Sequence, residues 1–123
     1  MKRGKKDNEK MTSDDFRRIA LSLPEACEQA HMGHPDFRVR KKIFATLGVP
    51  DNDWGMVKLT PELQKMWVRT EPAAFEPVNG AWGRQGCTRV CMAEVDEATL
   101  RDVLEAAWTN VAPKGLADQL EGA

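Results

Sequence analysis

Residues 34–47 read HPDFRVRKKIFATL, and this stretch decides the fold class. The β-branched and aromatic residues of Phe37–Val39 predict a strand, and Lys42–Leu47 predicts the strand that returns beside it. The turn between them would consist of Arg40 and Lys41. This turn is unusual, because a two-residue hairpin turn favours Asn and Gly, which accept positive φ. We therefore expect a β-hairpin whose tip carries several positive charges.

The residues that follow the hairpin predict another strand and a helix. Residues 54–59 have the composition of a strand. Thr60, Pro61 and Glu62 then provide an N-cap, a proline in the first turn and an acid near the positive end of the helix dipole. We expect this helix to bury three apolar side chains, those of Leu63, Met66 and Trp67.

Two further helices are predicted, one before and one after these elements. Thr12 and Asp15 resemble a capping box, and the apolar residues that follow at helical spacing are Phe16, Ile19, Ala20 and Leu23. Asp96 is expected to cap the last helix, which Pro113 ends. Its apolar residues with the same period are Leu100, Val103, Leu104, Ala107, Trp108 and Val111. Both stripes are expected to pack against the sheet, and residues 116–120 to add a short helical turn.

A second hairpin is predicted in the region between the two C-terminal helices. Val78–Trp82 and Cys87–Val95 would be its strands, joined around Gly83–Gly86, and Glu71–Pro77 would be irregular. Strands that are neighbours in sequence favour antiparallel pairing. The chain therefore predicts a single α+β domain, with a mostly antiparallel sheet of about five strands and helices packed on one face.

The composition is that of one small domain. The chain has 123 residues and a net charge of −1, and no apolar run approaches the ~20 residues that span a bilayer. We expect the domain at residues 12–120, a flexible basic arm at residues 1–11, no membrane association and a cytoplasmic location. Residues 36–91 hold nine basic and six acidic side chains, which favours a basic face in the middle of the chain.

Four potential zinc ligands occur close together, at Cys27, His31, His34 and Asp36. Their spacing fits no common structural zinc pattern, and we favour a polar loop that leads into the first strand. Cys87 and Cys91 would lie ~13 Å apart along a strand, too far apart to form a disulfide. No phosphate-binding loop, nucleophile elbow or metalloprotease helix occurs. We therefore expect a binding protein rather than an enzyme, with no catalytic residue and no cofactor.

Positive charge on the predicted hairpins is the remaining functional feature. Lys and Arg on a β-ribbon contact phosphates, and a two-stranded ribbon fits the major groove of DNA. A solvated hairpin tip is the simpler alternative, since exposed Lys and Arg are ordinary on any surface. The candidates for phosphate contact are Arg38, Arg40, Lys41, Lys42, Lys58 and Arg84.

Several motifs in combination resemble the MmcQ/YjbR family. They are residues 34–39, 42–47 and 57–62, the Trp82-Gly83-x-x-Gly86 motif, and residues 107–108 with 112–114. The resemblance covers about residues 12–120. It implies a frataxin-like (CyaY-like) sandwich and a proposed "double wing" of two hairpins that binds double-stranded DNA. The alternatives are a frataxin-like scaffold for a metal ion or small ligand, and a protein-interaction module that uses the open face of the sheet.

Overall fold

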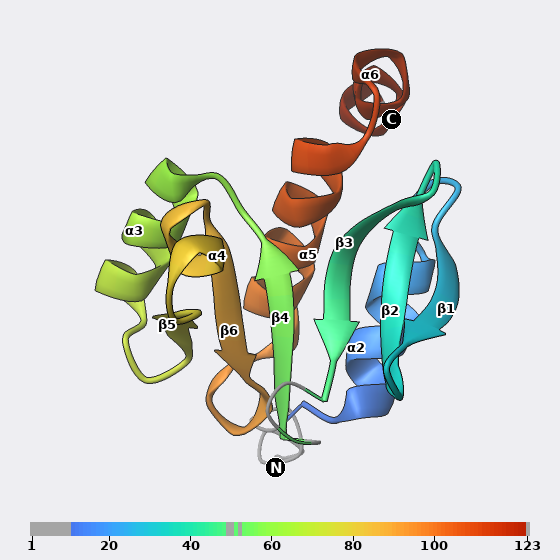
Figure 1. The fold of residues 1–123 in the computed structure, drawn as a ribbon. Helices are drawn as coiled ribbons and strands as arrows, with labels where there is room; N and C mark the ends of the chain where they lie inside the picture. The colour runs from blue at the N-terminus through green and yellow to red at the C-terminus, as the bar shows by residue number, and fades with distance from the viewer. Residues whose placement is uncertain (1–10, 49–50, 52, 123) are drawn as a thin grey trace, which may run out of the picture.

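Six strands form one antiparallel sheet in the computed structural model of the chain, which describes residues 11–48, 51 and 53–122 (Figure 1). Their spatial order is β1-β2-β3-β4-β6-β5. The strands are β1 (Cys27–His31), β2 (His34–Val39), β3 (Lys42–Leu47), β4 (Trp54–Lys58), β5 (Phe75–Pro77) and β6 (Cys87–Cys91). The predicted α+β class is confirmed, with one strand more than expected.

The hairpin of residues 34–47 forms as predicted, with Arg40 and Lys41 in its turn. Both residues have positive φ, 51° and 73°, so charged side chains occupy a turn geometry that favours Asn and Gly. A bulge shifts the register within the hairpin, and the consecutive residues Phe44 and Ala45 are both fully buried. The hairpin therefore contributes to the core at its middle and exposes charge at its tip.

An edge strand, β1, lies where the sequence predicted a polar loop. It pairs with β2 from Cys27, opposite Arg38, to His31, opposite His34. All five of its residues are exposed, so it lacks the alternation of buried and exposed residues that predicts a strand. Backbone pairing across a short turn, rather than side-chain burial, therefore holds this strand in place.

One face of the sheet is covered by α2 (Ser13–Leu21) and α5 (Glu97–Val111), which lie behind the strands in Figure 1. The capping box of Thr12 and Asp15 forms, and Asp96 accepts the backbone N–H of Thr99. The predicted stripes are buried, at most 5% exposed, at Phe16, Ile19, Ala20, Leu23, Leu100, Val103, Leu104, Ala107 and Trp108, while Val111 is half-buried. The indole N–H of Trp108 donates to the carbonyl of Pro24 at 2.9 Å, which satisfies a polar group inside the core.

The prediction of a second hairpin is wrong. The short β5 lies in the stretch expected to be irregular. A helical turn, α4 (Ala81–Arg84), replaces the end of the expected strand and the start of the expected hairpin turn. β6 ends at Cys91, and a 3-10 helix, η1 (Met92–Glu94), follows it. At Gly83 a Cβ would lie 1.6 Å from the carbonyl oxygen of Val78, so only glycine lets this turn pack against the chain before it.

The helix α3 (Pro61–Thr70) begins at the predicted cap, where Thr60 accepts the backbone N–H of Leu63. Its buried residue is Gln64, whose amide donates to the carbonyls of Gly83 and Cys87 at 2.9 and 3.0 Å. Met66, expected in the buried stripe, is 36% exposed. Leu63 and Trp67, the other two residues of the expected stripe, are partly buried and pack against the core. Apolar periodicity missed Gln64 because its burial depends on two hydrogen bonds and not on an apolar side chain.

The described domain begins at Met11, which is buried and donates its backbone N–H to the carbonyl of Met92. The rest of the predicted arm, residues 1–10, lies outside the described residues. At the other end, α6 (Lys114–Gly122) is longer than the short helical turn expected there. In the described part of the chain, no helix combines the length and apolarity needed to cross a bilayer.

Leu104→Ala tests the packing of α5. Leu104 is fully buried between α5 and the sheet, so its truncation removes apolar contacts and leaves a cavity. We expect a loss of about 2–5 kcal/mol in the free energy of unfolding, measured by urea denaturation. Thr109→Ala, on the exposed side of the same helix, should stay within about 0.5 kcal/mol of the parent. Equal effects of the two substitutions would contradict this orientation of α5.

Candidate binding face of the sheet

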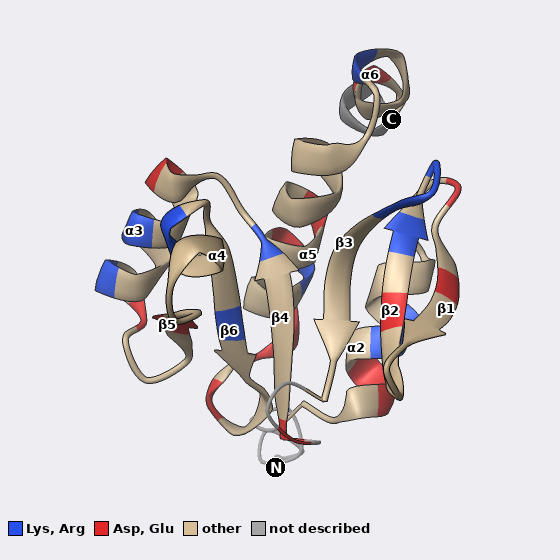
Figure 2. Ribbon diagram, viewed as in Figure 1, with Lys and Arg blue, Asp and Glu red and all other residues tan. Residues whose placement is uncertain are grey.

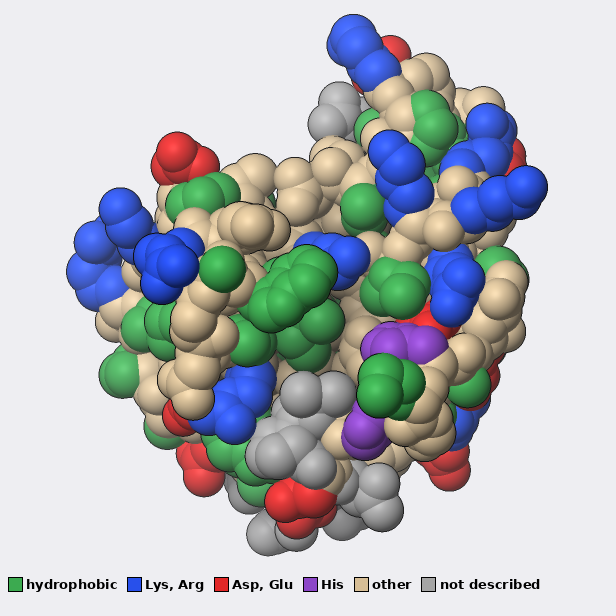
Figure 3. Space-filling view, in the orientation of Figure 1, with side chains coloured by type: hydrophobic (Ala, Val, Ile, Leu, Met, Phe, Trp, Pro, Cys, Tyr) green, Lys and Arg blue, Asp and Glu red, His purple; other side chains and the backbone are tan. Residues whose placement is uncertain are grey.

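The face of the sheet opposite α2 and α5 is the face toward the viewer in Figure 3. Cross-strand pairing aligns Asp36, Thr46, Met56 and Arg89 in one row on it, from β2 to β6. The next row along the strands, with Ala45 and Val57 among its members, is fully buried and points to the helices. Because side chains alternate between faces along a strand, the row of Asp36, Thr46, Met56 and Arg89 points away from the helices, toward the opposite face. We call this opposite face the open face.

Four unpaired cations lie where several elements reach the same end of the sheet. β2 and β4 end there and β3 begins there, and α4 ends nearby (Figure 2). The side chains are those of Lys41, Lys42, Lys58 and Arg84, which we call the basic edge. Lys58 is half-buried and the other three are exposed. Within the described part of the chain, no carboxylate forms an ion pair with any of the four.

The other two predicted phosphate contacts, Arg38 and Arg40, are bound to acids. Arg38 holds both oxygens of Asp36, with Nε 2.7 Å from Oδ1 and the second guanidinium contact at 3.1 Å. Arg40 makes the same forked contact with Glu25, at 2.5 and 3.0 Å. Bidentate pairs of this kind satisfy both partners. The structure thus separates the six predicted cations into two with internal partners and four without.

The four predicted metal ligands do not form one cluster in the described structure, because Asp36 binds His31 and Arg38 while His34 and Cys27 lie outside this network. Asp36 is fully buried, and its Oδ2 lies 2.7 Å from Nδ1 of His31 as well as beside Arg38. Its carboxylate is therefore occupied by a guanidinium and an imidazole. His34 packs by Gly48, and Cys27 is exposed on β1. Among the described residues, no group of three or more His, Cys, Asp or Glu side chains is arranged to hold a metal ion.

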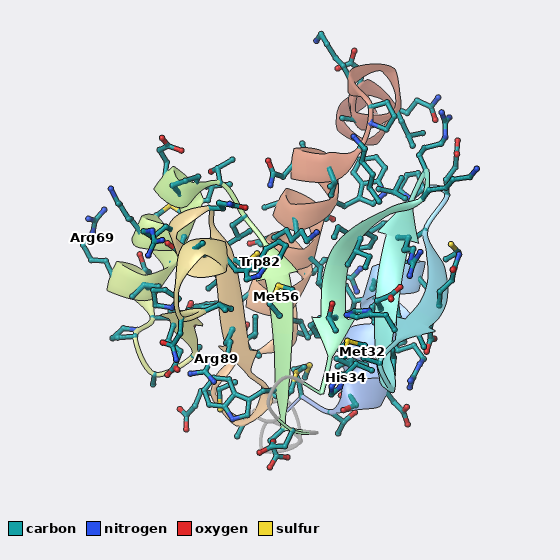
Figure 4. All side chains as sticks on the ribbon, in the orientation of Figure 1. Met32, His34, Met56, Arg69, Trp82 and Arg89 are labelled. Atoms are coloured by element: carbon teal, nitrogen blue, oxygen red, sulfur yellow. The ribbon has the colours of Figure 1, made fainter. Side chains whose placement is uncertain are left out.

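A groove of about 420 Å³ lies on the open face, next to the basic edge. Its apolar centre is formed by Met56 and by Trp82, whose side chain is 63% exposed and leans over the sheet from α4 (Figure 4). The described residues that line it are His31, Ile43, Thr46, Met56, Lys58, Val78, Trp82 and Cys87. The Oγ1 atom of Thr46 is buried and has no hydrogen-bond partner in the described structure. The groove thus combines an exposed aromatic ring, an unsatisfied hydroxyl and a cation.

Two glycines hold Trp82 in this position. Gly83 allows α4 to touch the backbone of Val78, as described above. At Gly86 φ is 113° and a Cβ would lie 1.9 Å from the carbonyl oxygen of Leu59, so the chain passes closely beside the end of β4. The Trp-Gly-x-x-Gly motif is therefore a backbone device that places an indole ring beside Lys58, and not part of a hairpin.

The sequence analysis did not single out Arg89, Trp82 or Thr46 as functional residues. Arg89 lies over the ring of Trp54, 5.3 Å from its centroid, and pairs with Glu76 on β5. None of the three belongs to a recognisable motif of charged or catalytic residues. The available signal was the position of Trp82 between glycines, which we interpreted as a strand end.

The cysteine in the groove has the properties of a structural residue. Burial raises the pKa of the Cys87 thiol, and the charge of Lys58 offsets this only in part. A thiol with a raised pKa stays protonated at neutral pH and is a poor nucleophile. Cys87 therefore suits a structural role better than that of a nucleophile.

Comparison with known proteins identifies relatives of this fold. A model of the YjbR family matches residues 21–110 of the chain. The crystal structure of the Deinococcus radiodurans protein DR2400, described with a DUF419 domain, aligns with a TM-score of 0.72 at 17% identity. The alignment covers 92% of this chain and 90% of that one, which shows a shared fold. A search of curated proteins finds no match.

Asp36→Asn tests the ionic network of β2. The Arg38 guanidinium, with a smaller contribution from His31, holds the pKa of the Asp36 carboxyl below its ordinary value despite burial. Because this pKa is lowered, the ionised carboxylate stabilises the fold at pH above 3.8, the ordinary value expected in the unfolded chain. This stabilisation is lost as the pH falls through the pKa of the folded state. At about pH 7 we expect the variant to lose about 1–3 kcal/mol of unfolding free energy.

The difference between parent and Asp36→Asn should shrink as the pH is lowered from about 7 to about 3, because below 3.8 the unfolded parent takes up protons more readily than the folded parent does. Glu25→Gln, which removes the exposed partner of Arg40, is the matched control and should cost much less. A loss that is the same at both pH values would show that packing, and not the charge of Asp36, is responsible.

Proposed function

This chain belongs to the YjbR family, and we propose that it binds double-stranded DNA through the basic edge, largely without sequence preference. The observation that carries this proposal is the convergence of four cations without ion-pair partners among the described residues: Lys41, Lys42, Lys58 and Arg84. A cation held by a nearby carboxylate gives up that partner when it binds a phosphate. The cations of the basic edge have no such ion pair among the described residues, so they can bind a phosphate without breaking one.

The β2–β3 hairpin supports the proposal by its shape. Its two-residue turn places Lys41 and Lys42 at the tip of a two-stranded ribbon, and such a ribbon fits the major groove of DNA. Arg40, beside them, keeps Glu25 in an ion pair, which reduces the repulsion between that acid and a phosphate. The tip therefore presents net positive charge although an acid lies next to it.

The second binding element would be α4 rather than a second hairpin. Its last residue, Arg84, is exposed, and the exposed Trp82 lies two residues before it on the same segment. Lys58 lies between this segment and the β2–β3 hairpin, at the end of β4. The proposed contact surface is thus one strand hairpin and one helical turn on either side of a central lysine. Contacts of this kind go to phosphates, which carry no sequence information.

The triple variant Lys41→Gln/Lys42→Gln/Lys58→Gln tests the proposal by fluorescence anisotropy with a labelled DNA duplex. The logarithm of affinity should fall with the logarithm of salt concentration, with a slope of about −0.9 for each phosphate neutralised. Removal of three contacts should therefore reduce the slope by up to about 2.7. Every variant keeps residues 1–10, so that any contribution of this basic segment stays constant.

The charge-matched control is Arg17→Gln/Arg18→Gln/Arg101→Gln. These arginines lie on α2 and α5, which cover the other face of the sheet, and all three form exposed or part-exposed ion pairs. We expect the control to keep the parent slope to within about one contact. If both triple variants lower the slope equally, the binding depends on net charge and the basic edge is not the site. If the parent does not bind at low salt, the proposal is wrong.

A further inference from the structure

The groove on the open face has the size and the chemistry of a small-molecule site. Its volume of about 420 Å³ lies within the range of ligand pockets, and apolar groups provide most of its lining. It extends from His31 on β1, across β3 and β4, to Trp82 on α4. Figure 3 shows the hollow in the middle of this face, with hydrophobic side chains along it.

Two polar groups in the groove lack partners. Thr46 is only 2% exposed, and its Oγ1 atom has no hydrogen-bond partner in the described structure. Leaving a buried hydroxyl unsatisfied is costly, and rotation of the Thr46 side chain toward a ligand atom in the groove would remove the cost. The ammonium group of Lys58 has no ion pair with a described residue, and none of the described residues that line the groove is Asp or Glu. The charge of the site therefore favours an anion.

The exposed indole defines the rest of the ligand. Trp82 is 63% exposed, although it is a large hydrophobic side chain held in place by a tightly packed glycine segment. Met56 lies beside it on the floor of the groove. An indole ring and a thioether form a flat, polarisable surface that suits the face of an aromatic ring. An aliphatic chain would leave much of this flat surface uncovered.

We propose that this groove binds a small planar aromatic molecule that carries one carboxylate. The ring stacks on Trp82 over Met56, one carboxylate oxygen pairs with Lys58, and the other oxygen accepts from the Thr46 hydroxyl. This site shares Lys58 with the proposed DNA contact and adjoins that contact at α4. Binding of the ligand would neutralise Lys58 and so compete with DNA for that one cation.

Titration with naphthalene-2-carboxylate, followed by ¹H–¹⁵N NMR of the full chain, tests the proposal. We expect saturable shifts in the amides of residues 43–46, 56–58 and 78–87 and in one tryptophan indole N–H. Naphthalene-2-carboxamide has the same rings without the charge and should bind roughly tenfold more weakly. Shifts that map elsewhere, or the absence of saturation at millimolar probe, would overturn the proposal.

Three variants separate the roles of the lining residues. Trp82→Ala should weaken the binding of naphthalene-2-carboxylate roughly tenfold. Lys58→Gln should abolish the preference of the groove for the carboxylate over the carboxamide. Thr46→Val removes the hydroxyl that would donate to the ligand, so it should weaken binding of the probe. It should not lower the melting temperature, because this hydroxyl is unsatisfied in the described structure. Arg69→Gln, on α3 and pointing away from the open face (Figure 4), is the control and should bind as the parent does. Equal binding by the Trp82 and Arg69 variants would contradict the site.

The same variants distinguish this proposal from DNA binding. Trp82→Ala carries no charge change, so the salt dependence of DNA binding should be that of the parent. A protein that binds DNA but not the naphthalene probe refutes only the groove. A protein that binds the probe in the groove but not DNA refutes only the basic edge.

Discussion

The burial of α5 against one side of the sheet is the interaction on which the rest of the structure depends. Leu100, Leu104 and Trp108 are fully buried there, and α2 packs beside them. Because side chains alternate along a strand, covering one face fixes which residues point to the other. The row that contains Asp36, Thr46, Met56 and Arg89 is on the open face for this reason. A shift of one residue in strand register would exchange the two rows.

Internal pairing then determines which charges of the open face are available. Asp36 binds Arg38 and His31, Glu25 binds Arg40, and Glu76 binds Arg89. Each pair fixes a long side chain and removes its charge from competition for ligands. Four cations without such partners among the described residues lie at the basic edge, next to Trp82, a large aromatic side chain that is mostly exposed. The binding properties of the protein are therefore set as much by which cations are paired as by how many there are.

Local signals in the sequence were sufficient for the elements that follow simple rules. The capping box at Thr12, the helix start at Thr60 and the apolar stripe of α5 were predicted correctly, since period and cap chemistry are local. The hairpin turn of Arg40 and Lys41 was also predicted, although neither residue favours positive φ. Both strands that flank it are long enough to fix the register by their buried residues.

The failures have a common physical origin in non-local contacts. β1 is exposed along its length and depends on pairing with β2, and α4 depends on the close approach of Gly83 to Val78. Gln64 is buried because two carbonyls far along the chain accept its amide. The ion pairs of Arg38 and Arg40 likewise require the folded sheet. Sequence reasoning could therefore predict the cations of the candidate site, but not which of them are unpaired.

The most direct measurement of the central claim is NMR chemical-shift mapping of the full chain with a short DNA duplex at low salt. If the basic edge is the contact surface, the amides that shift should cluster at residues 40–43, 58–60 and 82–86, while the outer surfaces of α2 and α5 should remain unchanged. Shifts centred on α2 and α5 would contradict the account, because they would place the binding surface on the opposite side of the molecule.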